Sequence, residues 1–224
     1  MTTSPHTQDS TPKLWYVYDA LCGWCYGFSP VMQEIHREYA SALEFDVFSG
    51  GMIRGSRIGA IGEVAPYISW AYKQVEDRTG VRFGEKFLHG ILADGTALFT
   101  SIPPALAMVV FKRSKPAQAL AFAHRLQTAI YFEGIQPSEY GVYGEYAQEF
   151  GFDAKEFSEQ MQHPATLEAA EQEFALCARL GITGFPTVLL QRGQTLTLLA
   201  QGYTDADTLR ELINAILQEN PATA

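Results

Sequence analysis

The stretch Asp19-Ala20-Leu21-Cys22-Gly23-Trp24-Cys25-Tyr26 decides how the rest of the chain is interpreted. The residues before it, 14–18, are aromatic and β-branched, which predicts a buried strand. The residues after it place apolar side chains at helical spacing as far as Tyr39, which predicts a long helix with one apolar face. The sequence therefore places a Cys-x-x-Cys pair where a strand turns into a helix.

This placement suits thiol–disulfide exchange. A helix N-terminus presents free N–H groups and a partial positive charge, which favour a thiolate over a thiol at Cys22. Cys25 lies one turn further along and is expected to be better shielded. Exchange requires an exposed attacking sulfur and a nearby sulfur that resolves the mixed disulfide. We therefore expect Cys22 to attack and Cys25 to resolve.

Two other uses of a Cys-x-x-Cys pair fit less well. Zinc takes four ligands, and the sequence holds no second Cys-x-x-Cys and no His-x-x-x-His, so no metal site is expected. A structural disulfide across two intervening residues would constrain little of the unfolded chain. Redox chemistry is the interpretation that the strand-to-helix context favours.

Composition describes an ordinary globular chain. Of its 224 residues 47% are hydrophobic and 18% are charged, which suits one large domain or a domain with a substantial insertion. The net charge of −9 argues against nucleic acid or an anionic membrane as a partner. Residues 1–12 read as a disordered tail without signal-peptide features, and no apolar run approaches the ~20 residues of a membrane span. With three cysteines, these features predict a cytoplasmic protein.

The remaining elements follow in order along the chain. Residues 42–48 predict a second strand, parallel to the first and joined to it by a right-handed crossover. Residues 55–162 carry almost no strand signal and predict a block of helices. A further amphipathic helix over 167–178 precedes a hairpin of two strands, 187–190 and 196–199. Asp205 or Asp207 is expected to cap a final helix.

This order resembles the thioredoxin fold with a large all-helical insertion, an α/β fold found in the DsbA family. A second motif supports the resemblance: Gly184-Phe185-Pro186-Thr187 precedes the hairpin, where thioredoxin-fold proteins carry a cis-proline. The resemblance implies a cis bond before Pro186, a position beside the cysteine pair, and a Phe185 backbone that pairs with substrate. It assigns 13–54 and 165–219 to the thioredoxin-fold domain, 55–164 to the helical insertion, and 220–224 to a tail.

The sequence Asp-x-x-Cys-x-Trp-Cys-Tyr is similar to a branch of predicted cytoplasmic protein-disulfide isomerases related to DsbA and to 2-hydroxychromene-2-carboxylate isomerase. The resemblance makes Cys22 and Cys25 catalytic. It places Trp24, Tyr26, Phe185 and Pro186 at the substrate. Gly23, Asp19, Gly184 and Thr187 are expected to support the site.

The chain departs from the family pattern at two points. Tyr16 occupies the position of the buried acid that thioredoxin and DsbA carry, so Asp19 or a residue elsewhere must accept the proton of the second thiol. The dipeptide between the cysteines is Gly23-Trp24 and not the Pro-His of DsbA, so it supplies no imidazolium for the Cys22 thiolate.

Three functions compete. The first is a thiol–disulfide oxidoreductase acting on protein or small-molecule thiols and disulfides, with no bound cofactor and with glutathione as a candidate co-substrate. The second is a glutathione-dependent isomerase or transferase of the kappa class, whose members usually carry serine at the position of Cys22 and would have no use for Cys25. The third is a non-catalytic adaptor that binds clients. The second cysteine favours the first function; the direction of electron flow, the natural substrate and the oligomeric state stay open.

Overall fold

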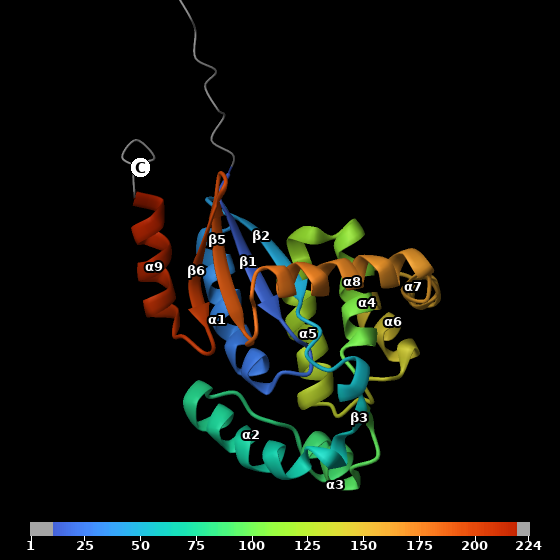
Figure 1. Ribbon diagram of the computed structural model, residues 1–224. Helices are drawn as coiled ribbons and strands as arrows, with labels where there is room; N and C mark the ends of the chain where they lie inside the picture. Colours follow the sequence, from blue (N-terminus) through green and yellow to red (C-terminus); the bar gives the residue numbers. More distant parts are fainter. Residues whose placement is uncertain (1–10, 219–224) are drawn as a thin grey trace, which may run out of the picture.

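The computed structural model describes residues 11–218 (Figure 1), and the expected tails fall almost wholly outside this range. Its main sheet has four strands in the order β2-β1-β5-β6. β1 runs parallel to β2 and antiparallel to β5, and β5 pairs with β6 as an antiparallel hairpin. This is the expected topology. The strands are β1 (Lys13–Tyr18), β2 (Glu44–Ser49), β5 (Thr187–Arg192) and β6 (Thr195–Gln201).

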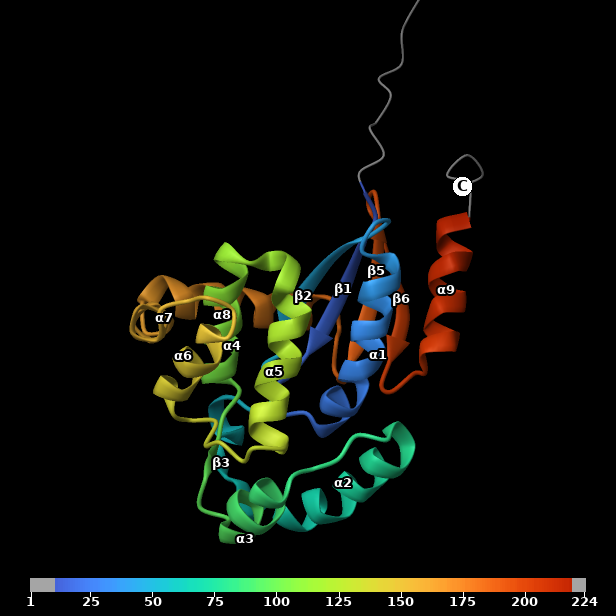
Figure 2. The ribbon, with the colours of Figure 1, turned by 180° about the vertical axis from the view of Figure 1, so that it is seen from behind.

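Helices cover both faces of this sheet. α1 (Gly23–Tyr39) packs Phe28, Met32 and Ile35 on one face, with α9 (Ala206–Gln218) beside it (Figure 2). α8 (Pro164–Arg179) covers the other face, where Cys177 packs with a valine of β1 and a leucine of β5. The α9 N-terminus is capped by Asp205, whose carboxylate accepts the Thr208 N–H at 2.8 Å. None of the helices within 11–218 is long and apolar enough to span a membrane.

The segment between β2 and α8 is mainly helical, as expected. Its α-helices are α2 (Ala65–Thr79), α3 (Leu92–Asp94), α4 (Ile102–Ser114), α5 (Ala119–Tyr131), α6 (Tyr140–Gln148) and α7 (Ala154–Met161). Short 3₁₀ turns cover Gly55–Arg57, Ile61–Glu63 and Pro116–Gln118, and a π-helix covers Lys86–Ile91. In Figure 1, α2 and α3 lie below the sheet and face the N-terminus of α1.

The expectation of almost no strand in this segment needs one addition. β3 (Gly59–Ala60) and β4 (Leu98–Phe99) form a separate antiparallel pair. Each strand has two residues, which is too short for an alternating pattern that a sequence could reveal. The pair closes the loop that carries α2, and Phe99 from it reaches the site described next.

Candidate functional site

Cys22 occupies the N-cap position of α1. Its backbone is extended, with φ −96° and ψ 111°, and its carbonyl accepts the Tyr26 N–H at 3.1 Å. The Cys22 N–H in turn donates to the Asp19 carbonyl at 3.1 Å, which closes the turn between β1 and α1. The residue is 7% exposed, more buried than the sequence analysis expected, because segments distant in sequence converge on it.

The three cysteines are free thiols in different surroundings. Cys25 is fully buried; burial, followed by its hydrogen bond with Cys22 and the charge of that neighbour, raises its pKa well above the ordinary value. Cys25 therefore stays protonated near neutral pH. Burial, with Glu173 as the second cause, raises the pKa of Cys177 to about 11. Cys177 is thus a core thiol, since it is also only 2% exposed.

The loop before β5 meets Cys22 from the far end of the chain. The Phe185–Pro186 peptide bond is cis, which confirms the sequence prediction. The Cys22 thiol faces the Phe185 carbonyl, with 3.6 Å between Sγ and O across 163 sequence positions. The Phe185 ring lies over Gly50, where an added Cβ would come within 2.0 Å of ring atom Cε1. Thr187 steadies the loop by donating its hydroxyl to the Gly184 carbonyl at 2.8 Å.

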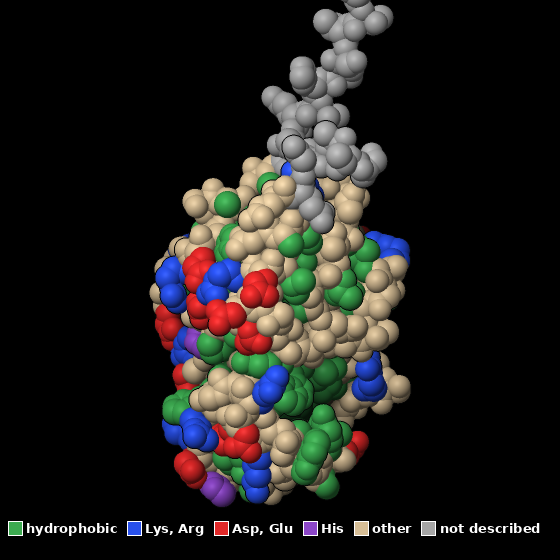
Figure 3. Space-filling view, turned by 90° about the vertical axis from the view of Figure 1, so that its left-hand side faces the viewer, with side chains coloured by type: hydrophobic (Ala, Val, Ile, Leu, Met, Phe, Trp, Pro, Cys, Tyr) green, Lys and Arg blue, Asp and Glu red, His purple; other side chains and the backbone are tan. Residues whose placement is uncertain are grey.

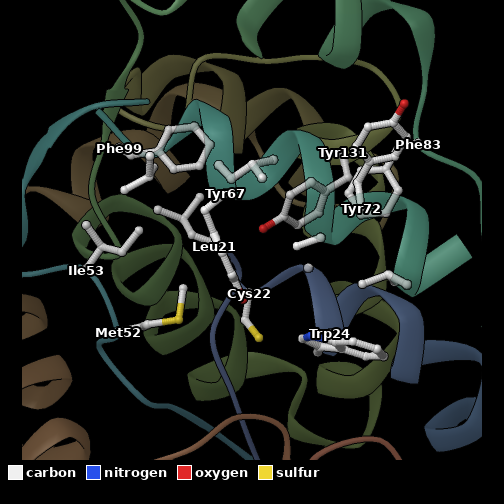
Figure 4. Close-up of a pocket in the computed structure, with 15 residues that line it drawn as sticks. Leu21, Cys22, Trp24, Met52, Ile53, Tyr67, Tyr72, Phe83, Phe99 and Tyr131 are labelled. Carbon is white, nitrogen blue, oxygen red and sulfur yellow. The ribbon is translucent and has the colours of Figure 1, made fainter. Parts of the chain in front are cut away.

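An apolar pocket of about 200 Å³ opens beside Cys22. Figure 4 shows Cys22 and Trp24 on one side of it and aromatic side chains on the other. Aliphatic and aromatic side chains of α2 and of the loops around it make up most of the wall. The lining residues are Leu21, Cys22, Gly23, Trp24, Met52, Ile53, Val64, Tyr67, Ile68, Ala71, Tyr72, Val75, Phe83, Phe99 and Tyr131.

A wider, more polar groove of about 480 Å³ lies on the other side of Trp24. Figure 3 shows hydrophobic side chains gathered around a hollow on this face. Trp24 separates the groove from the apolar pocket, and Arg78 adds a positive charge to it. The groove is lined by Trp24, Trp70, Gln74, Arg78, Phe185, Gly202 and Tyr203.

The Asp19 carboxylate organises the loops behind the pocket. It accepts the Leu21 N–H at 2.9 Å, the Met52 N–H at 2.7 Å and the Ser101 hydroxyl at 2.9 Å. Ser101 is linked further, because its hydroxyl oxygen accepts the Ile53 N–H at 2.9 Å. One side chain thus joins the turn before Cys22 to two pocket-lining segments.

Two other residues singled out by sequence lie behind the site. Tyr26 is buried; it packs on Phe83 and Tyr131 and donates its hydroxyl to the Arg82 carbonyl at 2.9 Å. It is not among the residues that line the pocket or the groove, so it supports their walls instead of facing substrate. Tyr16 donates to the Cys25 carbonyl at 3.5 Å, and burial raises its pKa well above the ordinary value, so it is no base.

Sequence reasoning missed the α2 side of the site. Tyr67 and Trp70 are 61% and 63% exposed, which is unusual for large aromatic side chains. With Gln74 and Arg78 they form one stripe along α2. The spacing of this stripe is visible in the sequence, but it does not show which part of the fold the stripe faces. Within the described residues, no group of three His, Cys, Asp or Glu side chains is placed to hold a metal ion.

Comparison with known families identifies the fold. The DSBA-like thioredoxin domain matches residues 92–214, more than half of the chain. The chain belongs to this family. The match begins beyond the cysteine pair, but it includes Phe185, whose carbonyl faces the Cys22 sulfur. A search among curated proteins finds no match.

Solved structures support the assignment to the DSBA-like family. A Nitrosomonas europaea protein, to which protein disulfide isomerase activity has been attributed, has a TM-score of 0.82 at 25% identity, over 93% of this chain and 98% of that one. The cytosolic disulfide reductase DsbM from Pseudomonas aeruginosa has a TM-score of 0.77 at 30% identity, over 92% and 98%. A structure of DsbM with GSH gives 0.76 at 29% identity, over 92% and 100%. A 2-hydroxychromene-2-carboxylate isomerase shares the fold, with a TM-score of 0.62 at 15% identity over 92% and 95%.

Proposed function

We propose that the protein is a cytoplasmic thiol–disulfide oxidoreductase in which Cys22 attacks a substrate disulfide and Cys25 resolves the mixed disulfide. One observation carries the proposal. The Cys22 sulfur sits at a helix N-cap on the wall of a pocket, while the buried Cys25 follows one turn later. The attacking sulfur is thereby placed to meet substrate, and the protonated Cys25 is held ready for the second step.

Glutathione is the proposed co-substrate. The relative DsbM has been solved with GSH, and the groove beside Trp24 combines the backbone of Phe185 with the positive charge of Arg78. A tripeptide with two carboxylates can pair with such a backbone and place one carboxylate near a guanidinium. The apolar pocket then favours disulfides that carry an apolar group close to the sulfur.

The test removes one sulfur at a time. Cys25→Ser is expected to accumulate mixed disulfides through Cys22 when it is incubated with a disulfide substrate, because no second thiol resolves them; intact-mass measurement detects the adduct. Cys22→Ser is expected to abolish disulfide reduction, followed by substrate thiol release. Cys177→Ser is the matched control and should keep the wild-type rate.

The same experiment separates the competing function. Turnover of Cys25→Ser at the wild-type rate would point to a monothiol mechanism, as in a glutathione-dependent isomerase or transferase. Turnover by Cys22→Ser would contradict both mechanisms that use this site. If the protein is a non-catalytic adaptor, the wild type itself should reduce no disulfide, and neither variant should differ from it.

A further inference from the structure

The side chain of Asp19 is a buried negative charge next to the cysteine pair. It is 1% exposed and stands three residues before Cys22. Among the described residues, no lysine, arginine or histidine forms an ion pair with it within 4.0 Å. Burying a carboxylate without a cation is costly, and proteins usually avoid it.

The hydrogen bonds around Asp19 suit the ionised form. Both of its oxygens are occupied by donors, the N–H groups of Leu21 and Met52 and the hydroxyl of Ser101. Burial raises the pKa of Asp19, while these three donors act against the increase. A carboxylate whose oxygens already accept three hydrogen bonds is poorly placed to take a proton from Cys25, the role that the sequence suggested. It acts better as a fixed charge.

This charge acts on the groups around it. Burial and the neighbouring Cys22 are the larger causes that raise the pKa of Cys25; the Asp19 carboxylate adds to them, although its backbone acts in the opposite sense. Three buried phenols, those of Tyr18, Tyr131 and Tyr143, each have a pKa that is raised first by burial and further by this charge. The guanidinium of Arg57, on the exposed turn after β2, is the cation that interacts with it.

We propose that Asp19 makes the Cys22–Cys25 pair a reductant. The inference rests on the proposed function and adds the direction of electron flow. A disulfide carries no charge, whereas the dithiol form gains stability when a thiolate forms. A fixed negative charge opposes that thiolate, so it destabilises the reduced pair and lowers its reduction potential. Asp19 touches no substrate and is a positioning residue in this sense: it sets the electrostatics of the pair.

The resulting cycle balances. The Cys22 thiolate bonds to one sulfur of the substrate disulfide, and the other sulfur leaves as a thiolate and takes a proton. Cys25 then loses its proton and bonds to Cys22, which releases the first sulfur as a second thiol. Two electrons pass to the substrate, and two glutathione thiols return them to the pair as they form oxidised glutathione.

The reduction potential of the full-length protein tests the proposal, by equilibration with glutathione buffers. Asp19→Asn is expected to raise the equilibrium constant for reduction by glutathione at least tenfold near pH 7, a shift of about 30 mV toward a more oxidising pair. Ser101→Ala removes a hydrogen-bond donor to Asp19 but keeps the charge. Its equilibrium constant for reduction by glutathione should therefore stay within about threefold of the wild-type value.

A second variant covers the case in which Asp19→Asn does not fold. Arg57→Gln removes the exposed cation, so it should shift the pair toward a more reducing potential, and less so in high salt. An unchanged or more oxidising potential in this variant overturns the proposal. The proposal is also overturned if Ser101→Ala shifts the reduction potential as much as Asp19→Asn does. The effect of Asp19→Asn would then come from the lost hydrogen bond and not from the lost charge. A wild-type pair that never equilibrates with glutathione would instead refute the proposed function.

Discussion

Gly50 shows how a missing side chain sets the geometry of the site. The Phe185 ring occupies the space that a Cβ would need, and the carbonyl of the same residue faces the Cys22 sulfur. A ring displaced by a methyl group would carry this carbonyl with it. The distance between the Cys22 sulfur and the Phe185 carbonyl therefore depends on the absence of a Cβ atom at Gly50.

Gly50→Ala is expected to lower the rate of Cys22-dependent disulfide reduction by about tenfold, because small misplacements at a reacting centre are costly. Replacing Phe185 by Ala in the same chain removes the ring and should restore most of the lost rate. Gly141→Ala is the control, since nothing lies within 4 Å of an added Cβ there. A Gly50→Ala enzyme with the wild-type rate would show that the loop position does not depend on this contact.

Local motifs revealed some of these residues and not others. The spacing of Cys22 and Cys25, and the proline before a predicted strand, can be read from neighbouring residues. The partners of Asp19 cannot, because Met52 and Ser101 follow it by 33 and 82 positions. Hydrogen bonds between distant segments leave no periodic signal in a sequence.

Among the elements, α2 supplies five of the fifteen residues that line the apolar pocket. It crosses α1 at Gly27, where an added Cβ would come within 2.7 Å of Val75. The contact holds α2 close enough to bring its apolar side chains over Cys22. Ala71, which is 8% exposed, lines the pocket at the centre of this face.

Ala71→Phe should fill the apolar pocket, which is little larger than an aromatic side chain. We expect the enzyme to lose at least about fivefold in kcat/KM for a mixed disulfide that carries an aromatic group, since burial of such a group is worth at least about 1 kcal/mol. Reduction of a small hydrophilic disulfide should change little. Ser69→Phe adds the same ring on the exposed side of α2 and serves as the control. Equal losses for both substrates would mean that the pocket does not select.

Within the predicted helical block, the sequence repeats apolar residues at helical spacing from Ile61 to Val75, which predicts a helix that begins near Ile61. The structure begins α2 at Ala65, with Pro66 in the first turn, where its fixed φ and missing N–H are tolerated. Ile61 belongs to a preceding 3₁₀ turn and is buried. The apolar periodicity therefore predicts that α2 exists, and Pro66 determines where α2 begins.

Across the whole molecule, Lys112 joins the helical segment to the sheet. From α4 it reaches Glu173 of α8 at 2.7 Å and Asp46 of β2 at 3.2 Å, with side chains that are 16%, 13% and 34% exposed. Interactions with these two acids raise the pKa of Lys112, although burial opposes the increase. Burial raises the pKa of Glu173 in spite of the lysine. The carboxyl is therefore held in its charged form mainly by this cation.

Lys112→Met is expected to lower the free energy of unfolding by about 3 kcal/mol near neutral pH, because it leaves a buried carboxylate without its cation. The pKa of Glu173 should rise further in the variant, so the folded state binds more protons than the unfolded one above about pH 4. The loss relative to wild type should thus grow as pH rises from there. Urea unfolding at several pH values measures it. Lys155→Met is the control, since Lys155 is 88% exposed in its pair; a similar loss there, or a loss independent of pH, would contradict the argument.

The 163 positions between Cys22 and Phe185 have a consequence for the chain while it is being made. A ribosome makes Cys22 and Cys25 long before it makes the carbonyl that faces the Cys22 sulfur. Until Phe185 has been made, the nascent polypeptide therefore carries a Cys22 thiol without this neighbour, open to any oxidant nearby. An oxidant that reaches the chain in this interval can join Cys22 to Cys25, or to a small thiol, before the hairpin has formed.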